Sequence, residues 1–106
     1  MIIDDAFFTL GSANLNLRSM AVDAEINIGC DDPLLSEKLR REVFSMHSGS
    51  AASCDGGNGT SSSIQSAFEA WQELLRVNRN KKASRKPLTG FLLPFSDVRT
   101  SSIRLA

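Results

Sequence analysis

A long apolar stripe with helical spacing runs through the C-terminal half of the sequence. Its members recur every three or four residues: Ile64, Ala67, Phe68, Trp71, Leu74 and Leu75. Ser62 and Gln65 have the spacing of a capping box, which places the helix start near residue 62. Because the basic segment 79–86 breaks the stripe, we expect this helix to span residues 62–78.

A shorter helix is expected before it. The Asp32 side chain can cap free helix amides, and Pro33 tolerates the first helical position. Apolar residues then form one stripe, which predicts a helix over 33–47: Leu35, Leu39, Val43 and Met46. Residues 48–61 are rich in Ser, Gly, Ala and Asn, so we expect a flexible loop without fixed structure.

Strand patterns fill the N-terminal 30 residues. The apolar residues 1–3 and 7–10 flank Asp4-Asp5, a pattern typical of a short β-hairpin. Residues 24–28 alternate small or apolar side chains with polar ones, which predicts a further strand. Strands followed by two helices indicate an α/β fold.

Length and charge exclude several classes of protein. The chain has 106 residues, enough for one small domain, and its 42% hydrophobic content is typical of soluble proteins. Twelve basic and twelve acidic residues give no net charge, which disfavours nucleic-acid binding. No apolar stretch approaches the roughly 20 residues that a membrane-spanning helix needs. We therefore expect a protein that is soluble or peripheral to a membrane.

The cysteines and the proline-bracketed stretch leave alternatives open. Cys30 and Cys54 flank the first predicted helix and are interpreted as free thiols, with a disulfide as the alternative. They lack the neighbours that zinc needs, so no metal and no cofactor is expected. Residues 88–93, between two prolines, could form an edge strand or an extended arm.

A cluster of small and polar residues follows the predicted hairpin. Glycine allows close backbone approach, while hydroxyl, amide and guanidinium groups donate hydrogen bonds, so the cluster could hold an oxyanion: Gly11, Ser12, Asn14, Asn16 and Arg18. Ser and Asn are also frequent in ordinary turns, which is the competing interpretation.

The stretch IIDDAFFTLGSANLNLRSM, followed by Asp23-Ala24-Glu25, resembles the second signature region of the phospholipase D superfamily. The family motif is His-x-Lys, four residues, Asp, then six residues and Gly-Ser-x-Asn. Asp4 precedes the sequence Gly11-Ser12-Ala13-Asn14 by this interval. Several residues downstream are similar to the branch that acts on phospholipids, including bacterial phospholipases and cardiolipin synthases: Asn16, Arg18, Ser19, Met20 and Glu25. The later stretches LRREVFSMHSG and LLPF are similar in a less specific way.

The resemblance implies a fold, a reaction and site residues. The fold would be a fragment of a phospholipase D-type α/β/α sandwich, and the reaction would be phospholipid hydrolysis to phosphatidic acid through a phosphohistidine, without a metal. Ser12 and Asn14 would contact the substrate phosphate, Asp4 would help to order the site, and Glu25 could orient a histidine.

The same resemblance implies that this chain is the C-terminal part of the catalytic domain. Counting back from Asp4 places the motif histidine four residues before Met1 and the lysine two residues before it. We expect residues 1–47 to hold the motif loop, strands and first helix, 48–61 a flexible loop, and 62–106 the second helix and a basic tail. The chain alone should be inactive, with the N-terminal half as its missing partner.

Other readings remain open. The chain could be a non-catalytic interaction module, or derive from a cardiolipin synthase-like or nuclease-like member. His47, the sole histidine, is expected to stabilise a helix end rather than act as a base. The basic segment could contact anionic lipid headgroups or be a solvated charge run: Arg79, Lys81, Lys82, Arg85 and Lys86.

Overall fold

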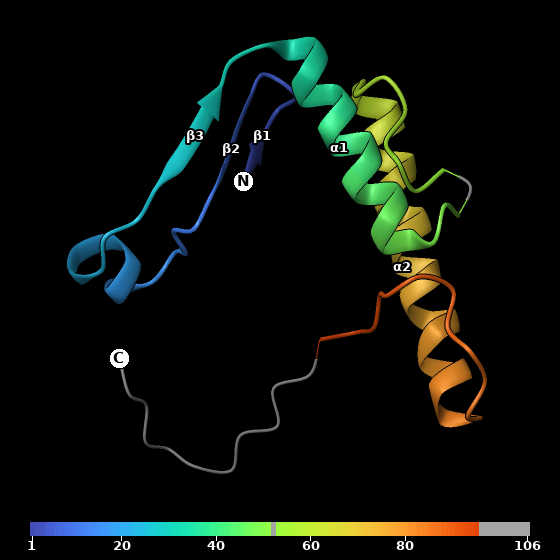
Figure 1. The fold of residues 1–106 in the computed structure, drawn as a ribbon. Helices are drawn as coiled ribbons and strands as arrows, with labels where there is room; N and C mark the ends of the chain where they lie inside the picture. The colour runs from blue at the N-terminus through green and yellow to red at the C-terminus, as the bar shows by residue number, and fades with distance from the viewer. Residues whose placement is uncertain (52, 96–106) are drawn as a thin grey trace.

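The computed structural model describes residues 1–51 and 53–95 and has a mixed α/β architecture. A three-stranded antiparallel sheet precedes two long helices (Figure 1). The elements are β1 (Ile2–Ile3), β2 (Phe7–Gly11), the π-helical turn η1 (Arg18–Val22), β3 (Asn27–Cys30), α1 (Pro33–Ser48) and α2 (Ser61–Ala83). The α/β class expected from the sequence is confirmed.

The β1–β2 hairpin forms where the acidic pair predicted it. The Ala6 amide donates to the Ile3 carbonyl at 2.9 Å. Asp4 and Asp5 have φ values of 50° and 53°, as the two central residues of a type I′ turn require. This turn matches the twist of the flanking strands, and because Ile3 pairs with Phe7, residues 4–6 connect them.

The third strand lies later in the chain than predicted. β2 is the central strand, and its pairing with β3 runs from Phe8 opposite Cys30 to Gly11 opposite Asn27. The expected strand 24–28 is therefore wrong at both ends. After Gly11 the chain leaves the sheet, so residues before Asn27 have no partner strand, and the alternating pattern at 24–26 is not expressed as pairing.

The start of α1 is confirmed, whereas both ends of α2 differ from the expectation. Asp32 Oδ1 accepts hydrogen bonds from the Leu34 amide at 2.9 Å and the Leu35 amide at 3.4 Å. At α2, the cap is Thr60, whose hydroxyl accepts from the Ser63 amide at 3.3 Å. α2 continues to Ala83 instead of ending at residue 78. The extension contains Arg, Lys and Ala, which favour helix, and cations stabilise a helix C-terminus.

Residues 48–51 and 53–61 have defined contacts, contrary to the loop without fixed structure expected over 48–61. Cys54 is buried, and its carbonyl accepts a 2.8 Å hydrogen bond from Trp71 Nε1. The Ser50 amide donates to the Ser45 carbonyl at 2.7 Å. The Gly-rich composition provides the positive φ values at Gly56, Gly57 and Gly59 that this path needs. Composition therefore indicated unusual backbone geometry rather than absence of structure.

The core is small and partly polar. The buried apolar residues of the described chain are Cys54, Ala67 and Leu74, and the rings of Phe44 and Trp71 meet edge-on at 5.1 Å. The polar or charged residues that are equally buried are Ser36, Arg40, Ser48 and Asn78. Many of the contacts between the strands, helices and connecting segments are therefore polar.

The proline-bracketed stretch forms no strand within the described chain. It turns back from the end of α2 as an irregular arm, consistent with the second expectation (Figure 1). The Asn78 side chain holds it by donating to the carbonyls of Thr89 and Leu92, at 2.9 and 2.8 Å, and accepting from the Thr89 amide at 3.1 Å. The Phe91 amide donates to the His47 carbonyl at 2.8 Å. The predicted tail beyond residue 95 lies outside the described residues.

Candidate functional site

Ser12 and Glu25 are brought together at the end of β2. Ser12 Oγ donates a short hydrogen bond to Glu25 Oε2 at 2.5 Å and accepts one from the Ile26 amide at 3.1 Å. The Ser12 amide in turn donates to the Ile26 carbonyl at 3.0 Å. Two residues predicted to serve one site, thirteen positions apart in the sequence, are thus in direct contact.

Asn27 closes the same turn and was not singled out from the sequence. Its Oδ1 accepts from the Ala13 amide at 3.2 Å. A side chain on Gly11 would overlap Asn27 and the Ile26 carbonyl, so glycine is required there. The only sequence signal for Asn27 was its place in an alternating strand pattern, which says nothing about this contact.

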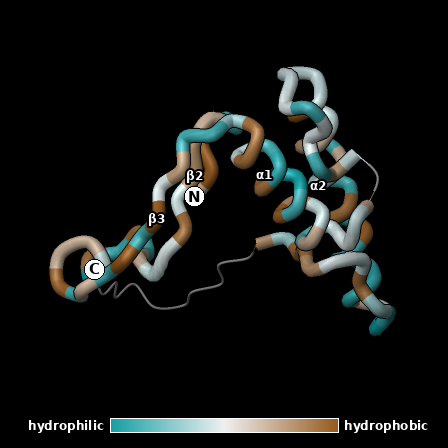
Figure 2. Tube along the Cα trace, turned by 45° about the horizontal axis from the view of Figure 1, so that its top comes forward, coloured by the Kyte–Doolittle hydropathy of each residue, from teal (hydrophilic) through white to brown (hydrophobic). Residues whose placement is uncertain are grey.

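Asn14 lies at the exposed surface of the turn. Its carbonyl accepts from the Asn16 amide at 2.9 Å, while Asn16 Oδ1 accepts from the Ser19 amide at 2.8 Å and leads into η1. Arg18 is ion-paired with Asp23 at 3.0 Å. The end of the sheet therefore presents hydroxyl, amide and guanidinium groups on an accessible surface. Hydrophobic residues, brown in Figure 2, surround these polar groups.

Asp4 lies at the opposite end of the hairpin from Ser12. β2 separates them, and its five residues span about 16 Å at ~3.3 Å per residue. Asp4 is exposed in the turn, and its neighbour Asp5 makes the ordering contacts instead. The structure brings Ser12, Asn14 and Glu25 to one end of the sheet but does not bring Asp4 there.

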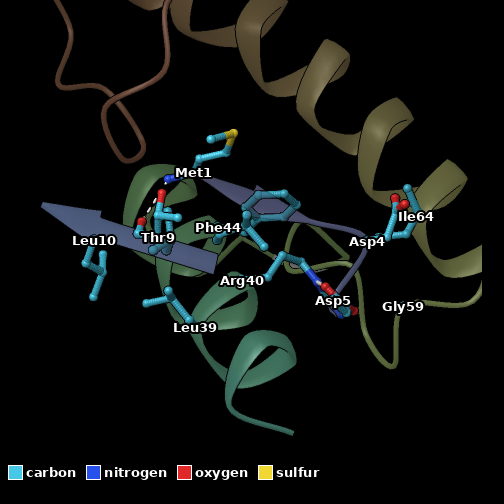
Figure 3. A pocket seen from close by; sticks show the side chains of 12 residues that line it. Met1, Asp4, Asp5, Thr9, Leu10, Leu39, Arg40, Phe44, Gly59 and Ile64 are labelled. Carbon is cyan, nitrogen blue, oxygen red and sulfur yellow. Dashed lines mark hydrogen bonds and ion pairs between the residues drawn. The ribbon is translucent and has the colours of Figure 1, made fainter. Parts of the chain in front are cut away.

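Arg40 makes more side-chain hydrogen bonds than any other residue of the described structure, and the sequence pattern did not single it out. It is 3% exposed and contacts Asp5 through Nε at 3.0 Å and Nη2 at 2.6 Å (Figure 3). Its other donors reach the carbonyls of Asp55 and Gly57. Hydrogen bonds from Arg40 lower the pKa of the Asp5 carboxyl below its ordinary value of 3.8. Arg40 thus joins the hairpin turn to the Gly-rich segment.

A cavity of about 610 Å³ lies beside this ion pair. Mostly apolar side chains from the hairpin and both helices line it (Figure 3): Met1, Ile2, Leu39, Val43, Phe44 and Ile64. Ser12, Asn14 and Glu25 are not among its lining residues. The Arg40 donors are already bound to Asp5 and to two carbonyls, so the cavity does not present a free cation to an anionic ligand.

The remaining predicted groups lie apart from the Ser12 turn. His47 is in the last turn of α1, while the Ser12 turn is at the far end of the sheet (Figure 1). Cys30 and Cys54 are free thiols, and burial raises the pKa of Cys54. Within residues 1–51 and 53–95, no three His, Cys, Asp or Glu residues form a metal-binding group. Over the same ranges, no helix has the length and apolar character to cross a membrane.

Comparison with known proteins assigns this chain to no family. No family model matches the sequence, and neither a curated protein nor a solved structure matches it significantly.

Proposed function

We propose that this chain is part of a phospholipase D-type phosphodiesterase that acts on phospholipids, with the Gly11–Asn14 turn as one half of its phosphate site. The contact between Ser12 Oγ and Glu25 Oε2 is the observation that carries the proposal. It joins a candidate phosphate-binding hydroxyl to the carboxylate proposed to orient a histidine. An ordinary turn needs no acidic partner from a distant segment.

The register of the hairpin supports the same assignment. Ile2 pairs with Phe8 and Ile3 with Phe7, so each step back along β1 moves one residue forward along β2. A preceding strand in this register would place the second residue before Met1 opposite Gly11 and the fourth opposite Ala13. These are the two offsets of the lysine and histidine in the family motif. Both would then lie beside the Ser12 turn.

The proposed mechanism divides one displacement into two. The motif histidine attacks phosphorus and forms a phosphohistidine, while a histidine from the other half protonates the leaving alcohol. Water then attacks the phosphohistidine and releases phosphatidic acid. Ser12 and Asn14 donate hydrogen bonds to the non-bridging oxygens as negative charge develops. When Ser12 turns towards phosphate, Glu25 is free to accept a hydrogen bond from the histidine. The strands and helices of this chain would form part of an α/β/α sandwich.

Hydrolysis of phosphatidylcholine and phosphatidylethanolamine tests the proposal. This chain alone should release no phosphatidic acid. The product of a reading frame that supplies His-x-Lys at the predicted offset, together with the first motif, should release it. In that product, Ser12→Ala or Asn14→Ala should lower kcat about 10²-fold or more. Asn80→Ala, on the exposed side of α2, is the matched control and should leave kcat unchanged. Sustained release by this chain that survives both site substitutions would overturn the proposal.

An interaction module is the second candidate, favoured by the exposed sheet. Ile26 and Ile28 are 77% and 69% exposed, and the outer edge of β3 has no partner strand within the described residues. Such an edge can pair with another strand.

Cardiolipin synthase-like and nuclease-like parents share the proposed chemistry, so offering phosphatidylglycerol or a DNA phosphodiester to the complete enzyme distinguishes them.

A further inference from the structure

The C-terminal end of α2 carries a concentration of positive charge. Residues 71–95 contain six basic side chains and one acidic side chain, Glu73, which is paired with Arg76. Five basic residues remain: Arg79, Lys81, Lys82, Arg85 and Lys86. No carboxylate of the described chain lies within ion-pair distance of them. Figure 2 shows this end of α2 in hydrophilic colours.

Continuation of the helix to Ala83 aligns part of this charge with an apolar stripe. Phe68, Leu75 and Lys82 are spaced by seven residues. Each therefore lies about 20° around the axis of α2 from the one before it, so all three are on one side of the helix. Arg79 is four residues after Leu75 and lies on the same side. Phe68 is 60% exposed and Leu75 is half-buried. One side of α2 thus passes from aromatic and aliphatic to cationic.

Acidic residues are absent from this side of α2. Glu69 and Glu73 are the acidic residues of the helix, and each lies about 100° or more from Phe68 around its axis. The side defined by Phe68, Leu75, Arg79 and Lys82, here the α2 stripe, therefore combines exposed apolar surface with uncompensated positive charge.

We infer that the α2 stripe is a docking surface for an anionic lipid membrane, with α2 lying along the interface. Basic side chains reach the headgroups while their methylene stems cover apolar surface, and Phe68 enters the acyl boundary. Positive charge near an anionic leaflet attracts the protein, with an effect that extends about one Debye length. The inference does not depend on the Ser12 turn or on hydrolysis.

The spacing of the stripe favours a membrane over a single-stranded nucleic acid. Phe68 and Arg79 are eleven residues apart, or about 16 Å along the helix at ~1.5 Å per residue. One nucleotide cannot contact both, and the intervening Leu75 has no ring on which a base could stack. A flat lipid surface can contact all of them together.

Co-sedimentation of the whole chain with vesicles tests the inference. The chain should bind vesicles of phosphatidylcholine with about 30% phosphatidylserine, and should bind pure phosphatidylcholine vesicles much more weakly. Raising the salt from about 0.1 M to about 0.5 M should release it. The double variant Arg79→Gln/Lys82→Gln should bind about 30-fold more weakly, and Phe68→Ala about tenfold more weakly.

A matched double variant on α1 controls for net charge. Lys38→Gln/Arg41→Gln removes the same two residue types at the same spacing from another exposed helix face and should keep full binding. Glutamine is a good helix former, so circular dichroism should show both double variants folded. Three results would each overturn the inference: equal binding to neutral vesicles, equal loss in the α1 variant, or binding to an RNA oligonucleotide without binding to vesicles.

Discussion

Arg40 shows how one buried charge can organise several segments. Removing a guanidinium from water is costly unless its nitrogens find acceptors. Here all three do, because Asp5 and the carbonyls of Asp55 and Gly57 accept four hydrogen bonds from them. Asp5 belongs to the hairpin turn, while the two carbonyls belong to the segment between the helices. The interaction is therefore a buried contact that connects two segments of the chain, unlike a surface ion pair.

Truncating Arg40 should destabilise the chain far more than truncating its neighbour. Arg40→Ala leaves Asp5 and two carbonyls without their donors, so we expect the free energy of unfolding to fall by about 3 kcal/mol. Arg41 is half exposed and its ion-pair contacts are 3.9 and 3.5 Å long, so Arg41→Ala should cost less than about 1 kcal/mol. Urea denaturation followed by circular dichroism measures both. Equal losses of unfolding free energy would show that the buried Arg40 contacts contribute no more than a surface ion pair.

Acid should weaken the same contact. Because Arg40 lowers the pKa of Asp5, the folded state binds this proton less readily than the unfolded chain, whose carboxyl titrates near 3.8. The stabilisation is thus present above about pH 4 and is lost as the pH falls through the lower folded pKa. Asp55, whose pKa is lowered mainly by the Gly57 amide, adds to this slope.

Replacing Asp5 isolates its share of the acid sensitivity. Asp5→Asn should be less stable than the parent at neutral pH, and its urea midpoint should change less between about pH 6 and pH 2.5. Asp4→Asn is the control, because Asp4 is exposed in the same turn and should leave the pH profile unchanged. If Asp4→Asn flattens the profile and Asp5→Asn does not, the assignment to Asp5 is wrong.

The sequence predicted residues of the candidate site but missed the Asp5–Arg40 contact that holds the hairpin turn. The Gly-Ser-x-Asn match singled out Ser12 and Asn14, and the similarity of the downstream residues singled out Glu25. The structure places Ser12 against Glu25. The motif selected Asp4, whereas Asp5 makes the contacts to Arg40, because motif spacing does not report which carboxylate faces a partner 35 positions away. Long-range polar contacts leave little trace in local patterns.

At the scale of elements, caps were easier to predict than helix ends. Asp32-Pro33 fixed the start of α1 because capping depends on adjacent residues. The end of α2 was missed because the apolar stripe stops before the helix does. Past residue 78 the helix is sustained by propensity and by the packed arm rather than by a continuous apolar face.

The arm should loosen when its anchor is removed. Asn78 is fully buried and makes three hydrogen bonds to Thr89 and Leu92, so Asn78→Ala leaves buried backbone groups unpaired. We expect a loss of about 2 kcal/mol and faster hydrogen exchange at the amides of Thr89 and Phe91. Asn80→Ala, on the exposed side of α2, should change neither. Unchanged exchange in Asn78→Ala would show that the arm is held by other contacts.

At the scale of the whole molecule, the sheet stands largely uncovered by the helices (Figure 1). Leu10 lies opposite Ile28, and Ile26 immediately precedes β3. These side chains are 54%, 69% and 77% exposed. Contiguous apolar surface on a strand edge usually contacts another chain or segment.

The isolated chain should therefore self-associate through the sheet. Sedimentation velocity should show larger species as concentration rises, and Ile28→Lys should shift the distribution towards monomer because a charge on β3 opposes edge pairing. Leu34→Lys, at a 78% exposed position of α1, is the control and should leave association unchanged. A parent chain that stays monomeric at every concentration contradicts this expectation.

The Asp5–Arg40 contact has a consequence for sequence divergence. A lone substitution at either position leaves a charge or several polar groups unsatisfied, whereas a joint replacement by two apolar residues of similar volume can preserve stability. In an alignment of related chains, Asp5 and Arg40 should therefore vary together, although 35 positions separate them. Such covariation would record selection for a stable hairpin even in lineages where the Ser12 turn has drifted.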